Sequence, residues 1–211
     1  IHTCGFILSA KEEAIDTILE IAEYKKDKLK KLIVTGCFVQ RYYEEVRKEF
    51  PEVDLFVKIS DYPKLPELLS KLLDHRFVHS YGKNRKLANS AYTAYLKISD
   101  GCDNRCTYCA IPLIRGNCHS YPIEDLVEEA KILLASGVKE LNIVAQDTTY
   151  YGHDLYGRFA LKDLIYELDK LDFKWIRILY MYPDEIEEDL LVTMKACKKV
   201  LPYFDIPIQH G

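Results

Sequence analysis

Three cysteines, Cys102, Cys106 and Cys109, lie close together in the middle of the chain. Cysteine thiolates are the protein ligands of iron–sulfur clusters, and the gaps of four and three residues offer no fourth cysteine at ferredoxin spacing. One iron of a four-iron cluster would therefore lack a protein ligand, and an open position is how a metal site admits a substrate or a cofactor. The spacing predicts a [4Fe–4S] cluster with a chemical role.

Zinc is the alternative metal for such a group of cysteines. Structural zinc sites have paired C-x₂-C knuckles or a clear fourth ligand. Cys118 and His119 follow the triplet, but neither stands at a typical spacing. A non-catalytic zinc-binding module is therefore kept as a second hypothesis, and metal analysis separates it from the first.

The triplet directly follows a predicted strand, Tyr95–Ser99, in a region where strands and helices alternate. Hydrophobic patterning predicts further strands and helices there, with Gly137 ending the first helix. The strands are expected at Glu140–Ala145, Ile176–Tyr180 and Tyr203–Ile206, and the helices at Ile123–Ser136, Leu161–Leu171 and Glu185–Lys198. This order is typical of a partial TIM-type β/α barrel, whose active site lies at the carboxyl ends of the strands.

The amino-terminal part also alternates between helix and strand, which predicts a parallel α/β sheet that lacks its first strand. Helices are expected at Glu12–Tyr24, Tyr42–Phe50 and Leu65–Leu73, and strands at Leu32–Thr35 and Val53–Val57. A polar stretch, 81–91, has little periodicity and is the candidate linker. We therefore expect one domain over 1–80 and a second, truncated one over 92–211.

Four more residues lie in loops beside predicted elements: Cys4 precedes a predicted helix, and the other three follow predicted strands. Cys4 and Cys37 fall in loops of the first sheet that gather along one edge, where they could help to bind a second cluster. Two ordinary, partly buried thiols are the alternative reading of the same pair. Gln146 and Asp147 follow the second strand of the predicted barrel, and we expect them at the same rim as the triplet.

The sequence C-x₃-C-x₂-C, with Tyr108 as the aromatic residue before its last cysteine, resembles the radical S-adenosylmethionine signature. The resemblance implies that the open iron chelates S-adenosylmethionine and that reduction yields a 5′-deoxyadenosyl radical. Tyr108, Gln146 and Asp147 become candidates for contacts with this cofactor. The cofactors would carry the chemistry, and the protein would supply ligation and orientation.

Together with the segments Thr3-Cys4-Gly5-Phe6 and Gly36-Cys37-Phe38, the triplet makes the chain similar to the methylthiotransferases. That family implies a flavodoxin-like first domain and an auxiliary [4Fe–4S] cluster held by three of its cysteines. Cys4 and Cys37 match two of them, and the third would lie upstream of Ile1. The implied cofactors are two [4Fe–4S] clusters and S-adenosylmethionine.

Two segments, 146–152 and 179–183, resemble the RimO-type branch, which modifies an aspartate of a small-subunit ribosomal protein. The resemblance implies transfer of a methylthio group to the aspartate β-carbon, with an electron donor such as flavodoxin or ferredoxin. The branch that modifies an adenosine of transfer RNA is the alternative substrate class. The chain departs from the family at Tyr121, where an arginine commonly stands, which weakens any family role at that position.

Composition agrees with an ordinary globular enzyme, with 48% hydrophobic and 29% charged residues. A net charge of −4 argues against a broad cationic surface for DNA. No apolar stretch is long enough to span a bilayer, and we expect a cytoplasmic protein without a membrane partner. The chain opens at Ile1 rather than at a methionine, and we expect it to be a segment of a longer protein.

Overall fold

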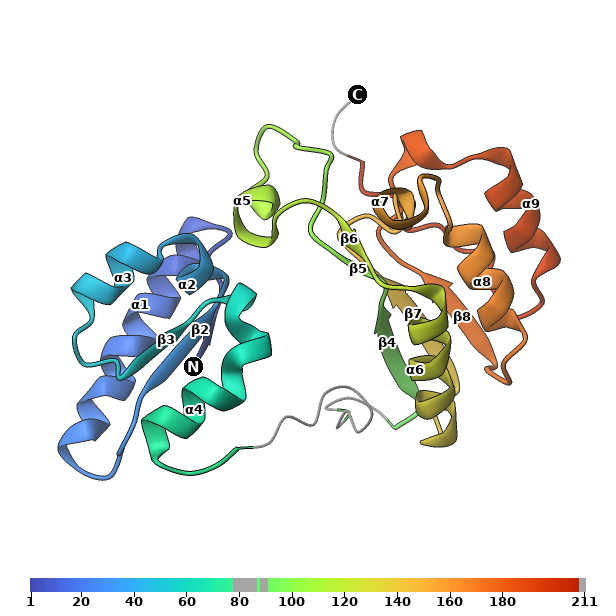
Figure 1. The fold of residues 1–211 in the computed structure, drawn as a ribbon. Coiled ribbons are helices and arrows are strands. Elements are labelled where there is room, and N and C mark those ends of the chain that lie inside the picture. Colours follow the sequence, from blue (N-terminus) through green and yellow to red (C-terminus); the bar gives the residue numbers. More distant parts are fainter. Residues whose placement is uncertain (78–86, 88–90, 209–211) are drawn as a thin grey trace. The chain divides into compact units, whose positions relative to one another are not determined.

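The computed structural model describes residues 1–77, 87 and 91–208. The chain divides into two compact units (Figure 1). The first unit contains the described residues up to 77 together with Cys106–Arg115, and the second contains the remainder. Most of the predicted linker, 81–91, lies outside the described residues, so the domain borders at 80 and 92 stay predictions.

The first unit contains a three-stranded parallel sheet in the order β1-β2-β3 (Figure 1). Its strands are β1 (His2–Thr3), β2 (Ile33–Gly36) and β3 (Leu55–Val57), and its helices are α1 (Leu8–Glu23), α2 (Cys37–Arg41), α3 (Tyr43–Glu49) and α4 (Leu65–Leu73), with 3₁₀ turns η1 (Tyr24–Lys26) and η2 (Ile59–Lys64). The parallel α/β prediction is confirmed. The structure adds a strand that the sequence did not predict, since His2–Thr3 pairs with β2 and is too short to show a periodic pattern.

The helix α1 follows its hydrophobic pattern at its centre but not at its start. Ala14 and Ile18 are buried and face the core of this unit, as the helical spacing predicts. The helix begins at Leu8 rather than Glu12, and Leu8 is 66% exposed. An exposed leucine at the start of a helix adds nothing to an amphipathic pattern, which explains the difference in the boundary.

The second unit contains another parallel sheet, in the order β4-β7-β8. Its strands are β4 (Thr93–Lys97), β7 (Glu140–Val144) and β8 (Trp175–Ile178), and its helices are α6 (Ile123–Ala135), α7 (His153–Tyr156), α8 (Leu161–Asp169) and α9 (Glu188–Ala196), with the 3₁₀ turn η3 (Pro183–Glu185). A hairpin of β5 (Ser99–Asp100) and β6 (His119–Ser120) follows β4 in space, while α5 (Ile111–Arg115) belongs to the first unit. The β/α prediction is confirmed, and no closed barrel forms among the described residues.

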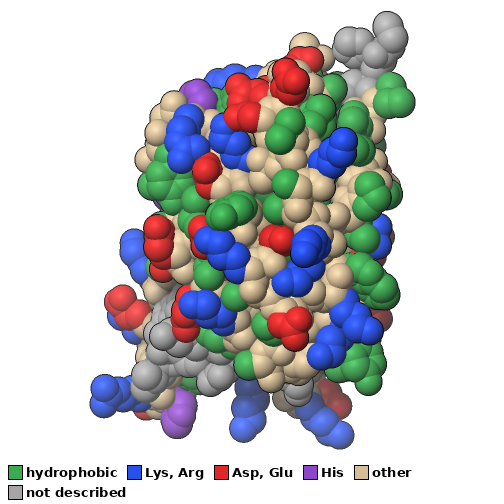
Figure 2. Space-filling model, turned by 90° about the vertical axis from the view of Figure 1, so that its right-hand side faces the viewer, with side chains coloured by type: hydrophobic (Ala, Val, Ile, Leu, Met, Phe, Trp, Pro, Cys, Tyr) green, Lys and Arg blue, Asp and Glu red, His purple; other side chains and the backbone are tan. Residues whose placement is uncertain are grey.

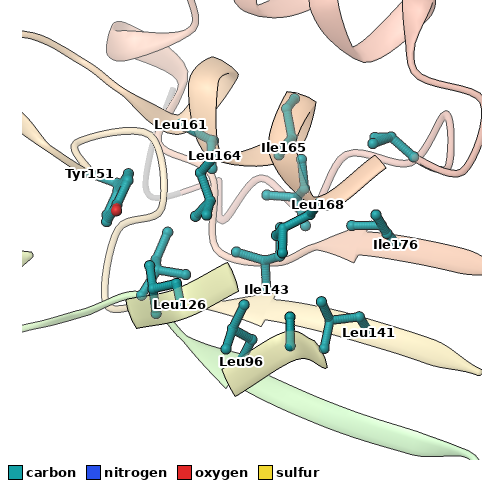
Figure 3. Close-up of a cluster of buried hydrophobic side chains, with 14 of the residues drawn as sticks. Leu96, Leu126, Leu141, Ile143, Tyr151, Leu161, Leu164, Ile165, Leu168 and Ile176 are labelled. Carbon is teal, nitrogen blue, oxygen red and sulfur yellow. The ribbon is translucent and has the colours of Figure 1, made fainter. Parts of the chain in front are cut away.

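The core of the second unit lies between this sheet and its helices (Figure 3). Helix α8 contributes four fully buried side chains at spacings of three and four residues, which is one face of a helix. They are Leu161, Leu164, Ile165 and Leu168, and they pack against the strand residues Leu96, Leu141, Ile143 and Ile176. Helix α6 ends beside Gly137, whose φ of 98° is the left-handed conformation predicted for a helix stop.

The predicted strand at Tyr203–Ile206 was wrong. Near this segment the described residues form an isolated bridge between Ile176 and Val200, and within it Asp205 O accepts from Met181 N at 2.9 Å and Tyr203 N donates to Leu201 O at 2.8 Å. Among the described residues no strand pairs with 203–206, so its apolar residues do not form a ladder. Elsewhere in the described part of the chain, none of the helices has the length and apolar character that crossing a bilayer requires.

Candidate cluster-binding site

The predicted cluster ligands lie on a loop, residues 101–118, at the carboxyl end of β4. The strand ends at Lys97 rather than at Ser99, because the chain turns into the short antiparallel pair β5–β6. Asp100 pairs with His119 across that hairpin, so the two arms of the loop meet at its base. Strands of two residues carry no readable pattern, and this hairpin was not predicted from the sequence.

Gly101 allows the two arms of this loop to approach each other. Its φ is 71°, and a Cβ atom at this position would lie 2.0 Å from the carbonyl oxygen of Asn117. The next residue, Cys102, donates its backbone N–H to the carbonyl oxygen of Gly116 at 3.2 Å. Glycine is therefore required immediately before the first cysteine, and the backbone contacts on both sides fix the position of the Cys102 backbone.

The other two cysteines belong to the first unit, in the segment Cys106–Arg115. Cys109 donates its N–H to the carbonyl oxygen of Cys106 at 2.9 Å, and its Sγ accepts a hydrogen bond from Ile111 N at 3.4 Å. All three cysteines of the triplet are partly buried thiols. In residues 1–77, 87 and 91–208 no three side chains of His, Cys, Asp or Glu stand together as a preformed metal site, so ligation by the triplet stays a prediction. The donor set, three accessible thiols on one loop, fits an iron–sulfur cluster.

Tyr108 lies between two of these cysteines and is 64% exposed. Partial loss of hydration raises the pKa of its phenol, and the thiolates of Cys106 and Cys109 raise it further. The phenol therefore stays neutral beside the predicted cluster ligands. This places a neutral, amphipathic ring at the position that the sequence assigned to a cofactor contact.

The zinc hypothesis loses its best fourth ligand in the structure. Cys118 is buried, and burial first, then the charge of Asp154, raises the pKa of its thiol to about 11. Zinc is bound by thiolate, and a thiol that holds its proton so strongly is a poor ligand. The second possible ligand, His119, has its Nδ1 4.0 Å from a carboxylate oxygen of Asp154.

Gln146 and Asp147 follow β7 at the carboxyl edge of the sheet, as predicted, but their environments differ. The side chain of Gln146 is exposed, whereas Asp147 is only 4% exposed. Asp147 Oδ1 accepts hydrogen bonds from Thr149 N at 3.0 Å, Thr149 Oγ1 at 2.6 Å and Tyr150 N at 3.3 Å. Its Oδ2 accepts from Asn104 Nδ2 at 2.8 Å, which connects the cysteine loop to the end of β7.

The two segments that suggested the RimO-type branch, 146–152 and 179–183, contact each other. Thr148 Oγ1 donates to the carbonyl oxygen of Leu179 at 2.9 Å, and Thr148 N donates to that of Tyr180 at 2.9 Å. Thr149 Oγ1, which donates to Asp147, accepts a hydrogen bond from Tyr182 N at 3.1 Å and lies 3.2 Å from Tyr182 O. The two threonines thus join the carboxyl ends of β7 and β8 into one rim.

Cys4 and Cys37 lie at one edge of the first sheet, as predicted. The register pairs Thr3 with Gly36, so each cysteine is the residue directly after a paired position. A Cβ atom on Gly36 would lie 2.2 Å from the carbonyl oxygen of Thr3, and one on Gly5 would lie 2.6 Å from the Cα of Phe38. Both glycines therefore permit a backbone contact that brings the two cysteine-bearing turns together.

The sequence alone did not assign a definite role to three further polar residues. Within the first unit, Arg115 Nη2 lies 4.0 Å from Cys37 Sγ. In the second unit, Tyr121 donates its hydroxyl to Asp100 Oδ2 at 2.6 Å beside the hairpin. Arg177 forms an ion pair with Glu140, with 3.0 Å between Nε and Oε1, so it is occupied within the sheet. The role of each of these three side chains depends on its tertiary neighbours, and no local sequence pattern indicates it.

Comparison with known families settles the class of protein. Residues 1–58 match the Uncharacterized protein family UPF0004, and residues 96–211, more than half of the chain, match the Radical SAM superfamily. The chain belongs to the radical SAM superfamily. The triplet, β7 and β8 lie within the matched region, which begins inside β4.

Curated relatives confirm the predicted resemblance to the RimO-type methylthiotransferases. The whole chain aligns at 50% identity with the "Ribosomal protein uS12 methylthiotransferase RimO" of Sulfurihydrogenibium sp., covering 48% of that protein. Proteins of the same name from Caldicellulosiruptor saccharolyticus and Clostridioides difficile are 48% and 49% identical over the whole chain, which covers 50% of each. The chain thus spans about half the length of the curated relatives it matches.

Solved structures agree with the fold of this radical SAM protein. It is similar to TsrM, a radical S-adenosylmethionine methyltransferase from Kitasatospora setae, at a TM-score of 0.62 and 13% identity. The match covers 88% of this chain and 42% of TsrM, in a structure with tryptophan substrate and an S-adenosylmethionine analogue bound. A second TsrM structure, with cobalamin and a [4Fe–4S] cluster, matches equally well. At this identity the likeness confirms the fold alone.

Proposed function

We propose that this radical SAM protein is part of a methylthiotransferase that modifies ribosomal protein uS12. The observation that carries the proposal is the identity of about half of all residues, along the whole chain, with proteins of that name. The contact between segments 146–152 and 179–183 supports it, because these segments suggested the RimO-type branch. The reaction would replace one hydrogen on the β-carbon of an aspartate with a methylthio group.

Cys102, Cys106 and Cys109 are proposed to hold the [4Fe–4S] cluster that binds S-adenosylmethionine. When bound, these cofactors supply a one-electron cleavage that produces a 5′-deoxyadenosyl radical. Gln146, exposed at the rim, and Tyr108 are proposed to contact the cofactor, and Oδ2 of Asp147 has room for one donor besides Asn104. The buried sheet beneath this rim would help to keep water from the reacting atoms.

Cys4 and Cys37 are proposed as two ligands of the auxiliary [4Fe–4S] cluster, with the third upstream of Ile1. The register Thr3–Gly36 supports a shared site, because it puts the two thiols on adjacent turns of one sheet edge. Arg115, 4.0 Å from Cys37 Sγ, offers a positive charge to a thiolate ligand. Iron binding beyond the first cluster in a longer chain, and its loss in Cys37→Ala, would test this assignment.

The transfer-RNA enzyme is the alternative within the same chemistry. Figure 2 shows Lys and Arg side chains interspersed with Asp and Glu on the face that it presents, which is unlike a continuous basic patch for phosphates. A groove of about 700 Å³ beside α6 and α8 shows the same mixture, with Lys131 and Lys162 near Glu124 and Glu167. We therefore favour the protein substrate, with a flavodoxin or ferredoxin as electron donor and the cytoplasm as the site of action.

The test begins with anaerobic reconstitution of the chain, iron and sulfide analysis, and a dithionite-driven assay for 5′-deoxyadenosine. We expect about four irons for the triplet and deoxyadenosine formation. Cys106→Ala should abolish both, whereas Cys197→Ala, which removes a buried thiol of the second core, should retain both. Zinc in place of iron, or normal cleavage by Cys106→Ala, would refute the site.

The substrate is tested separately with the longer protein. Mass spectrometry of uS12 and of transfer RNA after the reaction would show which one gains a methylthio group in place of hydrogen. Modification of uS12 alone is expected. Modification of transfer RNA alone would replace the proposed substrate and leave the radical chemistry intact.

A further inference from the structure

The first half of the cysteine loop is attached to the second unit by short polar contacts on two sides. On one side, Cys102 N donates to Gly116 O at 3.2 Å and Arg105 Nη2 donates to Asn117 Oδ1 at 3.2 Å. On the other side, Asn104 Nδ2 donates to Asp147 Oδ2 at 2.8 Å. The contacts of Cys102 and Arg105 join the two arms of the same loop. Of the three contacts, the Asn104 hydrogen bond is the one that connects this half of the loop to the end of β7.

The partner of Asn104 is itself rigidly placed. Asp147 is 4% exposed, and its other oxygen accepts three hydrogen bonds from Thr149 and Tyr150. Thr149 is in turn bonded to the backbone of Tyr182 after β8. The acceptor of the Asn104 hydrogen bond is therefore held by three further hydrogen bonds and cannot move to follow its donor.

We propose that Asn104 is a positioning residue that fixes the loop carrying the cluster ligands against the carboxyl end of β7, through Asp147. The inference rests on the proposed function for its consequence, since the same half of the loop carries Cys102. Hydrogen-bond partners that orient metal ligands typically influence metal affinity and reactivity without binding the metal themselves. Asn104 would act in this way on the cluster and on the access of S-adenosylmethionine to it.

The pair offers a test by exchange of its two groups. Asn104→Asp places two carboxylates face to face, and so removes the donor and adds repulsion. Adding Asp147→Asn to that variant restores one amide and one carboxylate in reversed order. The amide oxygen introduced at position 147 can still accept from Thr149 and Tyr150, because it has two lone pairs in the same place.

The first measurement is amide hydrogen exchange at about pH 8 on the 211-residue chain without metal, in peptides that cover residues 100–105. Asn104→Asp should exchange about tenfold faster there, and the double variant should return to within about twofold of the wild type. Gln146→Glu is the matched control, because it makes the same amide-to-acid change on an exposed neighbour of Asp147 and should leave the exchange of 100–105 unchanged. Equal exchange in Asn104→Asp and wild type, or no recovery in the double variant, would overturn the inference.

The second measurement uses the reconstituted chain. Asn104→Asp should lose iron to a chelator about tenfold faster, with a changed electron paramagnetic resonance spectrum of the reduced cluster, and the double variant should recover both. If the wild type binds no iron–sulfur cluster, the proposed function fails, and the exchange experiment still decides the role of Asn104. If the wild type binds its cluster and Asn104→Asp releases iron and gives a spectrum as the wild type does, the positioning role fails and the proposed function stands.

Discussion

The carboxyl group of Glu185 offers a pH-dependent test of the rim that joins β7 to β8. Its Oε2 is buried and has no hydrogen-bond partner among the described residues. Loss of hydration first, and then the charges of Asp147 and Asp184, raise its pKa from 4.5 to about 7. In the folded protein, Glu185 therefore keeps its proton to a higher pH than in the unfolded chain.

The sign of the effect on stability follows from this difference. Between about pH 4.5 and pH 7 the unfolded chain ionises while the folded one does not, so the free energy of unfolding falls across this range and stays low above it. A pKa change of this size corresponds to at most about 3 kcal/mol. Because Glu185 is only partly buried, screening by water reduces the expected effect to about 1 kcal/mol.

The perturbation is Glu185→Gln, which has nearly the same shape and no charge at any pH. Urea unfolding of wild type and variant, with a chelator present to remove any metal, should give similar stabilities near pH 5 and a variant more stable by about 1 kcal/mol near pH 8. Glu188→Gln, on an exposed residue of α9, controls for the loss of a negative charge. A difference between variant and wild type that is the same at both pH values would refute the burial argument.

Three other changes test the fold around the sites. Gly101→Ala should destabilise the second unit by about 2 kcal/mol or more and lower its iron content. Gly116→Ala should cost only about 1 kcal/mol, because its φ is 76° but no atom lies within 4 Å of the added Cβ. Thermal unfolding and iron analysis of both variants would check these values. Asp54→Asn should destabilise the first unit by about 1 kcal/mol at neutral pH. Burial alone would raise the pKa of Asp54, but hydrogen bonds from Lys25, Leu32 N and Lys31 lower it to about 2. In acid titrations followed by circular dichroism, the stability advantage of the wild type should therefore vanish as the pH falls from about 4 to about 2. Leu164→Ala should cost about 3 kcal/mol in urea unfolding because the side chain is fully buried, and Leu191→Ala, at 41% exposure, should change little.

The sequence predicted those parts of the fold in which local pattern and burial agree. Helix α8 begins at Leu161 as predicted, because its buried leucines and isoleucine repeat at helical spacing, and β7 begins at Glu140 as predicted, because a short buried run is typical of a parallel strand. The strand predicted at Tyr203–Ile206 has similar apolar content, yet the structure pairs only Val200 with Ile176. Strand formation needs a partner ladder, and the pattern of one segment does not reveal it.

The candidate site was predictable in its ligand types and not in its supporting contacts. The spacing of Cys102, Cys106 and Cys109 carries the chemistry in the sequence itself, and Gln146 and Asp147 were placed at the rim by strand order. The bond between Asn104 and Asp147 joins residues 43 positions apart. Such a contact depends on how β7 lies beside β4, which only the folded structure determines.

The glycines next to the cysteines show why spacing alone understates what the sequence specifies. Gly5, Gly36 and Gly101 each border a predicted ligand, and at each one an added Cβ would lie within 2.6 Å of another backbone segment. Cysteine spacing determines which thiols can reach a cluster, but the close backbone contacts at the glycines determine the position of the backbone that carries each thiol. A sequence with the same cysteines and alanine at these three positions would keep the motif and lose the turns that present it. We therefore expect the glycines to limit cluster assembly as strictly as the cysteines do, in the auxiliary site as well as in the loop after β4.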